Sequence, residues 1–371
     1  MGKLLTIEGT QEYSINMGPQ HPSTHGVFRM VVHLEGEVVT KVEPKIGYLH
    51  RGLEKMAESR TYAQFVPYTD RLDYLAGPHN SLGYVQAVEK LMGIEIPERA
   101  EYLRIIFAEL GRIASHLVMI ASGSLDICGW TPWSYCFRDR ERILDLFEMT
   151  AGNRMTPNYF RIGGVSRDVP EELIPALKSF VDDMPEMIEE YYGIFFGNEI
   201  VQSRMKSVGI LPKELAENLL ITGANLRASG VPYDVRKAEP YGIYDRFDFN
   251  VPVLHGGDTY DRHLIRLLEI QESRKILQQA LRDMPEGPVI AKVPKVIKPP
   301  VGKVYHRVEN PKGEMGWYIV SNGTTKPARV RIRTGAFVNV QMLSAIIAGW
   351  KIQDLVTIFA SMDLVLGEVD K

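Results

Sequence analysis

Hydrophobic and polar positions follow two different periods along the chain. Residues 4–16 and 27–43 alternate with a period of two, which is typical of strands with one buried face, and Gly36 and Glu37 turn the second segment into a hairpin. From about residue 51 to 284 the apolar residues recur at steps of three and four, which predicts helices. The fold is therefore expected to begin with a small β module and to continue as a helical bundle.

The clearest helix of that long segment is expected over residues 97–121. Residues 117–121 are apolar on every side, so the end of this helix should be buried. This fully apolar run is far shorter than the ~20 residues that cross a bilayer, so no membrane span is expected. Further helices are expected over residues 138–151, 170–192, 212–228 and 258–284.

The pattern changes again after the last of these helices. Prolines interrupt residues 285–301, and the polar turn at Asn322 and Gly323 is typical of a hairpin. The two strands of that hairpin and a final helix are expected over residues 317–320, 328–332 and 341–360. The predicted fold is α+β and helix-rich, with an N-terminal β module (1–50), a central helical bundle (51–284) and a small C-terminal α+β segment (285–371).

Composition excludes several classes of function. The 371 residues are 45% hydrophobic and 24% charged, as in an ordinary globular protein. Lys and Arg total 43 against 46 for Asp and Glu, and the net charge of -3 argues against nucleic-acid binding. The two cysteines, Cys128 and Cys136, are too few for a Cys₄ zinc site or a self-contained iron–sulfur cluster.

Common nucleotide-binding and metal-binding motifs are absent from the sequence. It contains no Gly-x-Gly-x-x-Gly, Walker A or His-Glu-x-x-His pattern, which argues against a nucleotide-binding dehydrogenase formed by this chain alone. His21 and His25 are four residues apart in a loop, but Pro22 argues against a helical metal-binding face and no neighbouring Cys or carboxylate completes a ligand set. Loop histidines bonded to the backbone are the alternative interpretation.

Asp126 follows the predicted buried helix in an otherwise apolar segment. An ionised carboxylate there needs a partner, because a buried unpaired charge costs several kcal/mol. A histidine is a natural partner, and its protonated form would be stabilised. A purely structural salt bridge has the same sequence signature, so both interpretations stay open at this point.

Five segments spread along the chain carry a resemblance to a known family. They lie at residues 17–27 (MGPQHPSTHGV), 47–54 (GYLHRGLE), 70–74 (DRLDY), 161–165 (RIGGV) and 227–236 (RASGVPYDVR). In this order they resemble the 49 kDa-type subunit of respiratory complex I, the NADH–quinone oxidoreductase, from about residue 14 to the C-terminus. That family is related to the large subunit of nickel–iron hydrogenases, which implies a mostly helical fold with smaller β-containing parts.

The resemblance also implies that this chain binds no metal. Hydrogenases hold nickel and iron through four cysteines, and the matching positions here are Asp73, Ala76, Val365 and Glu368. Soft thiolates are the ligands that would capture nickel, so hydrogenase activity is excluded. The former metal pocket is expected to hold another redox partner.

In complex I relatives that partner is a quinone headgroup. Carried over residue by residue, the resemblance implies that His25 and Tyr74 bind the headgroup and that Asp126 pairs with the histidine. It also implies that Arg51 and Arg71 lie near a [4Fe–4S] cluster in a neighbouring subunit. Quinone reduction consumes two electrons and two protons, and a tyrosine hydroxyl and a protonated histidine can donate those protons.

The resemblance implies a multi-subunit complex on the cytoplasmic face of the cell membrane, coupled to proton translocation. Its expected partners are an iron–sulfur subunit of the connecting module, a 30 kDa-type subunit and the membrane arm. The alternative is the same subunit in a deazaflavin-donor (coenzyme F420H2) or ferredoxin-dependent complex that reduces methanophenazine or another quinone. A non-catalytic scaffold is a different class of function, and it would need none of His25, Tyr74 and Asp126.

One position departs from the family pattern. Thr156 stands where many family members have a histidine next to the terminal cluster. An ionisable histidine beside a cluster stabilises the reduced state and raises the potential. The threonine predicts a lower-potential cluster with little pH dependence, which favours menaquinone or methanophenazine over ubiquinone as the acceptor.

Overall fold

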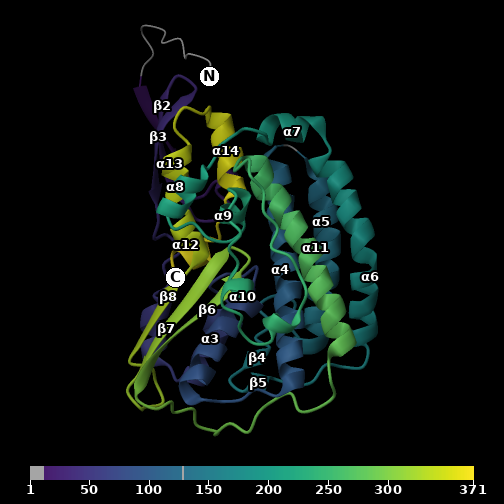
Figure 1. Cartoon of the computed structure of the whole chain (residues 1–371). Coiled ribbons are helices and arrows are strands. Elements are labelled where there is room, and N and C mark those ends of the chain that lie inside the picture. Colours follow the sequence, from purple (N-terminus) through teal and green to yellow (C-terminus); the bar gives the residue numbers. More distant parts are fainter. Residues whose placement is uncertain (1–11, 128) are drawn as a thin grey trace.

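The structure is a computed structural model that describes residues 12–127 and 129–371. Four long helices lie side by side on one flank of the molecule, and two small sheets lie on the other (Figure 1). The four helices are α4 (Glu98–Asp126), α5 (Trp130–Ala151), α6 (Leu173–Tyr191) and α11 (Thr259–Asp283). The predicted α+β, helix-rich fold is thereby confirmed.

The N-terminal sheet is antiparallel, with its three strands in chain order. Its strands are β1 (Glu12–Met17), β2 (Arg29–Glu35) and β3 (Val38–Lys45). In β2, Met30, Val32 and Leu34 are buried while their neighbours are half-exposed, so the alternation of the sequence faces one core. The predicted hairpin is confirmed, and the part of the expected first strand before residue 12 lies outside the described residues.

The two ends of the chain share that core. Side chains of β2 and β3 form one hydrophobic cluster with the C-terminal helices. Those helices are α12 (Gly335–Asn339), α13 (Gln341–Ile346), α14 (Ile352–Ser361) and α15 (Leu366–Val369). In Figure 1, α13 and α14 lie beside these strands. This packing carries the loop before β2 to the side of α14, where the candidate site lies.

The second sheet packs on α3 (Gly77–Met92) and consists of β6 (Gly302–Asn310), β7 (Gly313–Ser321) and β8 (Arg329–Arg333). Trp317 of β7 is fully buried against α3. A Cβ atom at Gly83 would lie 2.7 Å from its indole nitrogen, so only glycine allows this approach. The predicted β7–β8 hairpin is confirmed, whereas β6, which follows the proline-rich break, was not predicted.

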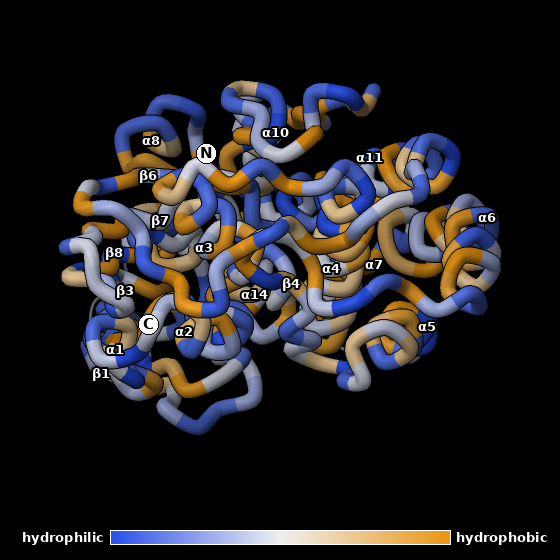
Figure 2. Tube along the Cα trace, turned by 90° about the horizontal axis from the view of Figure 1, so that it is seen from below, coloured by the Kyte–Doolittle hydropathy of each residue, from blue (hydrophilic) through white to orange (hydrophobic). Residues whose placement is uncertain are grey.

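Helix α4 forms the centre of the bundle. It is longer than the predicted 97–121 segment and ends at Asp126. By length and composition it could cross a membrane, but 89% of its most apolar window is buried inside the protein. Figure 2 shows hydrophobic residues along α4 in the middle of the view and hydrophilic residues on the peripheral loops.

Three predicted helices have different bounds in the structure. Helix α5 begins at Trp130, eight residues before the expected start at 138. The 212–228 segment forms two short helices, α8 (Lys213–Asn218) and α9 (Ala224–Ala228), because Gly223 turns the chain at φ 73°. The expected 341–360 helix is likewise divided into α13 and α14, and Gly349 in the intervening turn has φ 89°.

Shorter elements complete the described chain. They are the 3₁₀ turns η1 (Pro22–Thr24) and η3 (Tyr244–Arg246), the π turn η2 (Tyr192–Phe196), the helices α1 (Leu53–Ser59), α2 (Tyr62–Thr69), α7 (Glu199–Met205) and α10 (Val235–Ala238), and the strands β4 (Phe160–Arg161) and β5 (Gly164–Val165).

Candidate functional site

A cavity of about 520 Å³ lies where four distant segments of the chain meet. The segments are the loop that carries η1, the turn after α2, the last turns of α4 and the stretch that follows α14. Its lining residues are Pro22, Ser23, His25, Tyr74, Leu75, Val118, Met119, Ser122, Leu125, Asp126, Ala360, Asp363, Leu364 and Val365. A mostly apolar wall with a few polar groups suits a flat organic ligand with polar ends.

The loop that carries His25 has a fixed conformation. His25 ends η1 in the left-handed region, at φ 50° and ψ 37°. The Thr24 hydroxyl donates to His21 O at 2.7 Å and ties the turn together. The His25 ring also meets the ring of Phe359 edge-on, with centroids 6.3 Å apart, so both the backbone and α14 position the imidazole.

His25 and Asp126 contact each other across a separation of 101 residues. His25 Nε2 lies 2.7 Å from Asp126 Oδ2, and the side chains are 21% and 9% exposed. Asp126 is the last residue of α4, where the helix dipole adds partial negative charge. The His25 Nδ1 makes no hydrogen bond to any described residue, so this ring nitrogen is available to bond a ligand.

Tyr74 is the second polar group that faces this cavity. Burial raises the pKa of its hydroxyl, and the neighbouring Asp73 raises it further, while the charge of Arg51 acts in the opposite direction. The hydroxyl is therefore a neutral donor at neutral pH. The three predicted site residues His25, Tyr74 and Asp126 thus line one cavity.

Neither of the two predicted arginines lines this cavity. Arg51 is half-buried and donates from Nη2 to Gly367 O at 2.9 Å, and burial lowers its pKa. Arg71 is exposed and donates to Pro67 O. It lines a separate surface cavity of about 550 Å³ with Arg60, Gln64, Pro67 and Tyr68.

Thr156 lies in a loop that is tied to the turn carrying Arg71. It adopts φ 49°, and two residues later the Asn158 N–H donates to Asp70 Oδ2 at 2.6 Å. Burial raises the pKa of Asp70 to about 7, although the Asn158 bond and the charge of Arg71 lower it. Asp70 is therefore a group beside this loop that titrates near neutral pH.

Asp363 is a cavity residue that was not predicted as part of the site. Its carboxylate contacts Lys312 Nζ at 3.0 Å and Arg266 Nε at 3.2 Å. Burial raises its pKa, but these two cations outweigh burial and the net pKa is lowered. The signal that pointed to Asp126, a carboxylate directly after an apolar helix, applies equally to Asp363 after α14.

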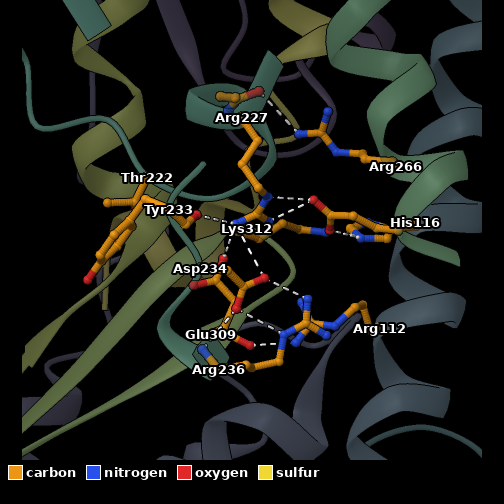
Figure 3. Close-up of polar contacts among 12 residues, drawn as sticks. Arg112, His116, Thr222, Arg227, Tyr233, Asp234, Arg236, Arg266, Glu309 and Lys312 are labelled. Atoms are coloured by element: carbon orange, nitrogen blue, oxygen red, sulfur yellow. Dashed lines mark hydrogen bonds and ion pairs between the residues drawn. The ribbon is translucent and has the colours of Figure 1, made fainter. Parts of the chain in front are cut away.

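A network of buried ion pairs joins α4, α11 and β6 (Figure 3). Arg227 contacts Glu269 at 2.7 Å and Glu309 at 2.7 Å, and His116 Nε2 lies 2.9 Å from the other carboxylate oxygen of Glu269. Burial raises the pKa of Glu269, but the charge of Arg227 and the bond to His116 lower it well below its usual value. Burial lowers the pKa of His116 to about 4, so this histidine is neutral.

The same network continues towards α10. Arg236 contacts Asp234 at 2.7 Å and Glu109 at 3.2 Å, and Arg112 donates to Glu309 O at 2.7 Å. Each of these side chains is fully or almost fully buried. The 227–236 segment that carried the family resemblance therefore supplies buried ion pairs, and it supplies no wall of the cavity.

No group of three or more His, Cys, Asp or Glu side chains converges as a metal site within residues 12–127 and 129–371. Cys136 is buried, and Cys128 lies outside the described residues.

The chain matches a known family of proteins. A model of the family described as "Respiratory-chain NADH dehydrogenase, 49 Kd subunit" matches residues 126–301 and 293–371. The chain belongs to this 49 kDa subunit family. The predicted family resemblance is thereby confirmed.

Members of the 49 kDa subunit family match this chain over nearly their whole length. A relative from Desulfitobacterium hafniense (strain Y51), which is named as a subunit of NADH-quinone oxidoreductase, is 73% identical over 364 residues, or 98% of each chain. Relatives of the same name from Clostridium beijerinckii and Bacillus anthracis are 58% and 51% identical. These alignments cover 98% and 97% of this chain and 98% and 99% of the relatives.

Proposed function

We propose that this chain is the quinone-site subunit of a complex I-like oxidoreductase, in which electrons pass from a [4Fe–4S] cluster in a neighbouring subunit to a membrane quinone and drive proton translocation. The observation that carries this proposal is the cavity lined by His25, Tyr74 and Asp126. The names of the relatives support it, since each is called a subunit of an NADH-quinone oxidoreductase. Family membership identifies a respiratory-chain subunit. The reaction at the site is inferred from the polar residues that line the cavity.

The cavity supports binding of a quinone headgroup between two donors. One headgroup oxygen accepts from the Tyr74 hydroxyl and the other accepts from His25 Nδ1–H, since Asp126 already occupies Nε2. The apolar side chains of Val118, Met119 and Leu364 then contact the faces of the ring. Two hydrogen bonds to the carbonyl oxygens favour the reduced form, because negative charge develops on those oxygens as electrons arrive.

The same two donors supply the protons of the reaction. Two electrons from the neighbouring cluster and one proton each from Tyr74 and His25 convert the quinone to the quinol. Proton loss from His25 leaves the Asp126 carboxylate without a cationic partner at the end of α4. This local change of charge is the proposed signal to the membrane arm, because it alters the contact between the His25 loop and α4.

Arg71, Thr156 and the surface cavity beside Tyr68 form the proposed face for the iron–sulfur subunit. Arg71 is exposed there, and the Asp70–Asn158 bond keeps the Thr156 loop beside the Arg71 turn. Arg51 is half-buried, its charge acts on Tyr74, and it is the second arginine proposed to lie near the cluster. A threonine at 156 supports a low-potential cluster and therefore menaquinone or methanophenazine as the acceptor.

The remaining partners of the proposed complex are a 30 kDa-type subunit and the membrane arm, with the chain peripheral on the cytoplasmic side of the membrane. The relatives' names favour NADH as the ultimate donor. A coenzyme F420H2 or ferredoxin module would use the same cavity, so the purified complex distinguishes these donors by which of them it oxidises.

The proposal is tested by replacing the two donors in the assembled complex. Tyr74→Phe removes one hydroxyl and His25→Ala removes a charge-assisted donor, so each should lower quinone reduction by about tenfold or more while the complex still assembles. Tyr48→Phe is a matched control, because Tyr48 is exposed and lies outside the cavity. Wild-type turnover of both site variants with the native quinone would contradict the assignment of the cavity.

A further inference from the structure

Two buried carboxyl groups close in sequence to residues of the cavity take no part in the steps above. Asp73 and Glu368 are both fully buried. An added Cβ at Gly367 would lie 2.6 Å from Leu72 O, so the backbone before Glu368 runs directly against the backbone before Asp73. The backbones that carry the two carboxyls are therefore adjacent, and the charge of Asp73 acts on both Glu368 and Tyr74.

A third carboxyl takes the ion pairs next to this pair. Asp363 acts electrostatically on both Asp73 and Glu368, and it forms the ion pairs with Lys312 and Arg266. Asp73 makes one hydrogen bond, from Leu75 N at 3.0 Å to Oδ1, and its Oδ2 has no partner among the described residues. Neither oxygen of Glu368 makes a well-formed hydrogen bond to the described chain.

Two further cations lie nearby but form no ion pair with Asp73 or Glu368. Lys371 donates to Ile332 O and Arg51 donates to Gly367 O, while Lys371 also interacts electrostatically with Glu368. Lys312 is the cation that acts on both Asp73 and Glu368, and its ion pair is with Asp363. Two buried carboxylates without an ion pair are costly, and a single shared proton lowers that cost.

We propose that Asp73 and Glu368 form a proton-sharing pair that holds one exchangeable proton next to Tyr74. The inference rests on the proposed function for its role in turnover. After Tyr74 gives its proton to the quinone, the proton of the pair passes to the tyrosinate oxygen, and the pair takes a replacement proton from bulk water. No electron moves in this step, and the O–H bond formed at Tyr74 balances the one broken at the carboxyl.

Two electrostatic observations agree with the geometry. Burial and the charge of Asp73 raise the pKa of Glu368 to about 8, while Lys312 lowers it. Burial raises the pKa of Asp73 as well, and Lys312 again opposes the shift. Because the charge on Asp73 raises the pKa of Tyr74, a protonated pair also makes Tyr74 the better acid.

The pair predicts a titration step on the alkaline side of neutrality. Below a pH of about 8 the pair keeps its proton, and above it the pair becomes doubly negative and Tyr74 becomes a poorer donor. Quinone reduction by the wild-type complex should therefore fall as the pH rises through about 8. Glu368→Gln imitates the protonated carboxyl but cannot release a proton, so this step should disappear and turnover should fall about tenfold or more.

The experiment measures assembly, the pH profile of quinone reduction and the infrared band of protonated carboxyl groups in the membrane-bound complex. Glu368→Gln should remove one such band, Glu368→Asp should restore it, and Asp73→Asn should shift the alkaline step. Glu272→Gln is the matched control, because Glu272 of α11 is mostly buried but is bonded to Lys275 and Asn250 N, away from the cavity.

Three results would overturn the pair. The first is a Glu368→Gln complex with the wild-type band and pH profile. The second is a failure of all three variants to assemble, because an amide should replace a protonated carboxyl at this site. The third is a Glu368→Gln complex that loses the band yet keeps wild-type turnover, which would remove the role in proton supply. A Tyr74→Phe complex that reduces quinone at the wild-type rate would instead refute the proposed function. That result would leave the pair untouched, since the infrared band does not depend on quinone.

Discussion

Replacement of Asp126 by asparagine removes the negative charge that contacts the His25 ring. The substitution keeps the size of the side chain and the end of α4, and it converts a charge-assisted contact of 2.7 Å into a neutral one. The account predicts slower quinone reduction together with weaker coupling to proton translocation, because both depend on the proton of His25.

The size of the effect follows from the geometry of the contact. A hydrogen bond between charged partners contributes roughly 1.5–3 kcal/mol to stability. The His25 side chain is 21% exposed and that of Asp126 is 9% exposed, so solvent screening is only partial. Because about 1.4 kcal/mol corresponds to a factor of ten, turnover should fall by about tenfold to a hundredfold.

The assay compares turnover with the native quinone and proton pumping in membrane vesicles that contain the assembled complex. Asp283→Asn is the matched control, since Asp283 is the last residue of α11 but lies exposed beside Arg282. The control should retain both activities. Wild-type turnover and wild-type pumping in Asp126→Asn would refute the role assigned to the His25–Asp126 pair.

Four further outcomes are expected. The chain purified alone should show no quinone reductase activity, because it supplies one wall of the site and its two cysteines cannot hold a cluster; such activity in an isolated monomer would contradict this. In a redox titration the neighbouring cluster should have a lower potential than in histidine-bearing relatives, and Thr156→His should raise it, where ~59 mV is a tenfold change for one electron. Any pH dependence of the cluster potential that remains in the wild type should come from Asp70, which gains negative charge as the pH rises through about 7. Asp70→Asn should therefore remove this pH dependence, and an unchanged dependence would refute this source. Glu269→Gln should lower the free energy of unfolding by about 3–5 kcal/mol, because it removes one charged partner of the buried Arg227. Normal thermal stability of this variant would show that the network is not needed for folding.

The sequence predicted those elements in which one period persists over several turns or strand residues. The alternation through Met30, Val32 and Leu34 predicted the strand correctly, and the steps of three and four predicted α4. The helix break at Gly223 was missed because a close approach in space decides the conformation there. A Cβ at Gly223 would lie 2.5 Å from the Cα of Gly313, ninety residues later, and no local pattern contains that contact.

Some residues of the candidate site could likewise be predicted from the sequence, and others could not. A carboxylate after an apolar helix is visible in the sequence, which is why Asp126 was expected to have a histidine partner. The choice of His25 came from the family resemblance, because the two residues are 101 positions apart. Asp73 and Glu368 were noted only as replacements for metal ligands, since the pairing of two carboxyls almost three hundred residues apart depends on tertiary packing.

The central claim is that a quinone headgroup occupies the cavity between Tyr74 and His25. A map of the purified complex with a bound quinone tests it most directly. Headgroup density should lie within hydrogen-bond distance of the Tyr74 hydroxyl and His25 Nδ1, with an iron–sulfur subunit against the Arg71 face. Headgroup density elsewhere in the complex, with this cavity filled by protein side chains, would contradict it.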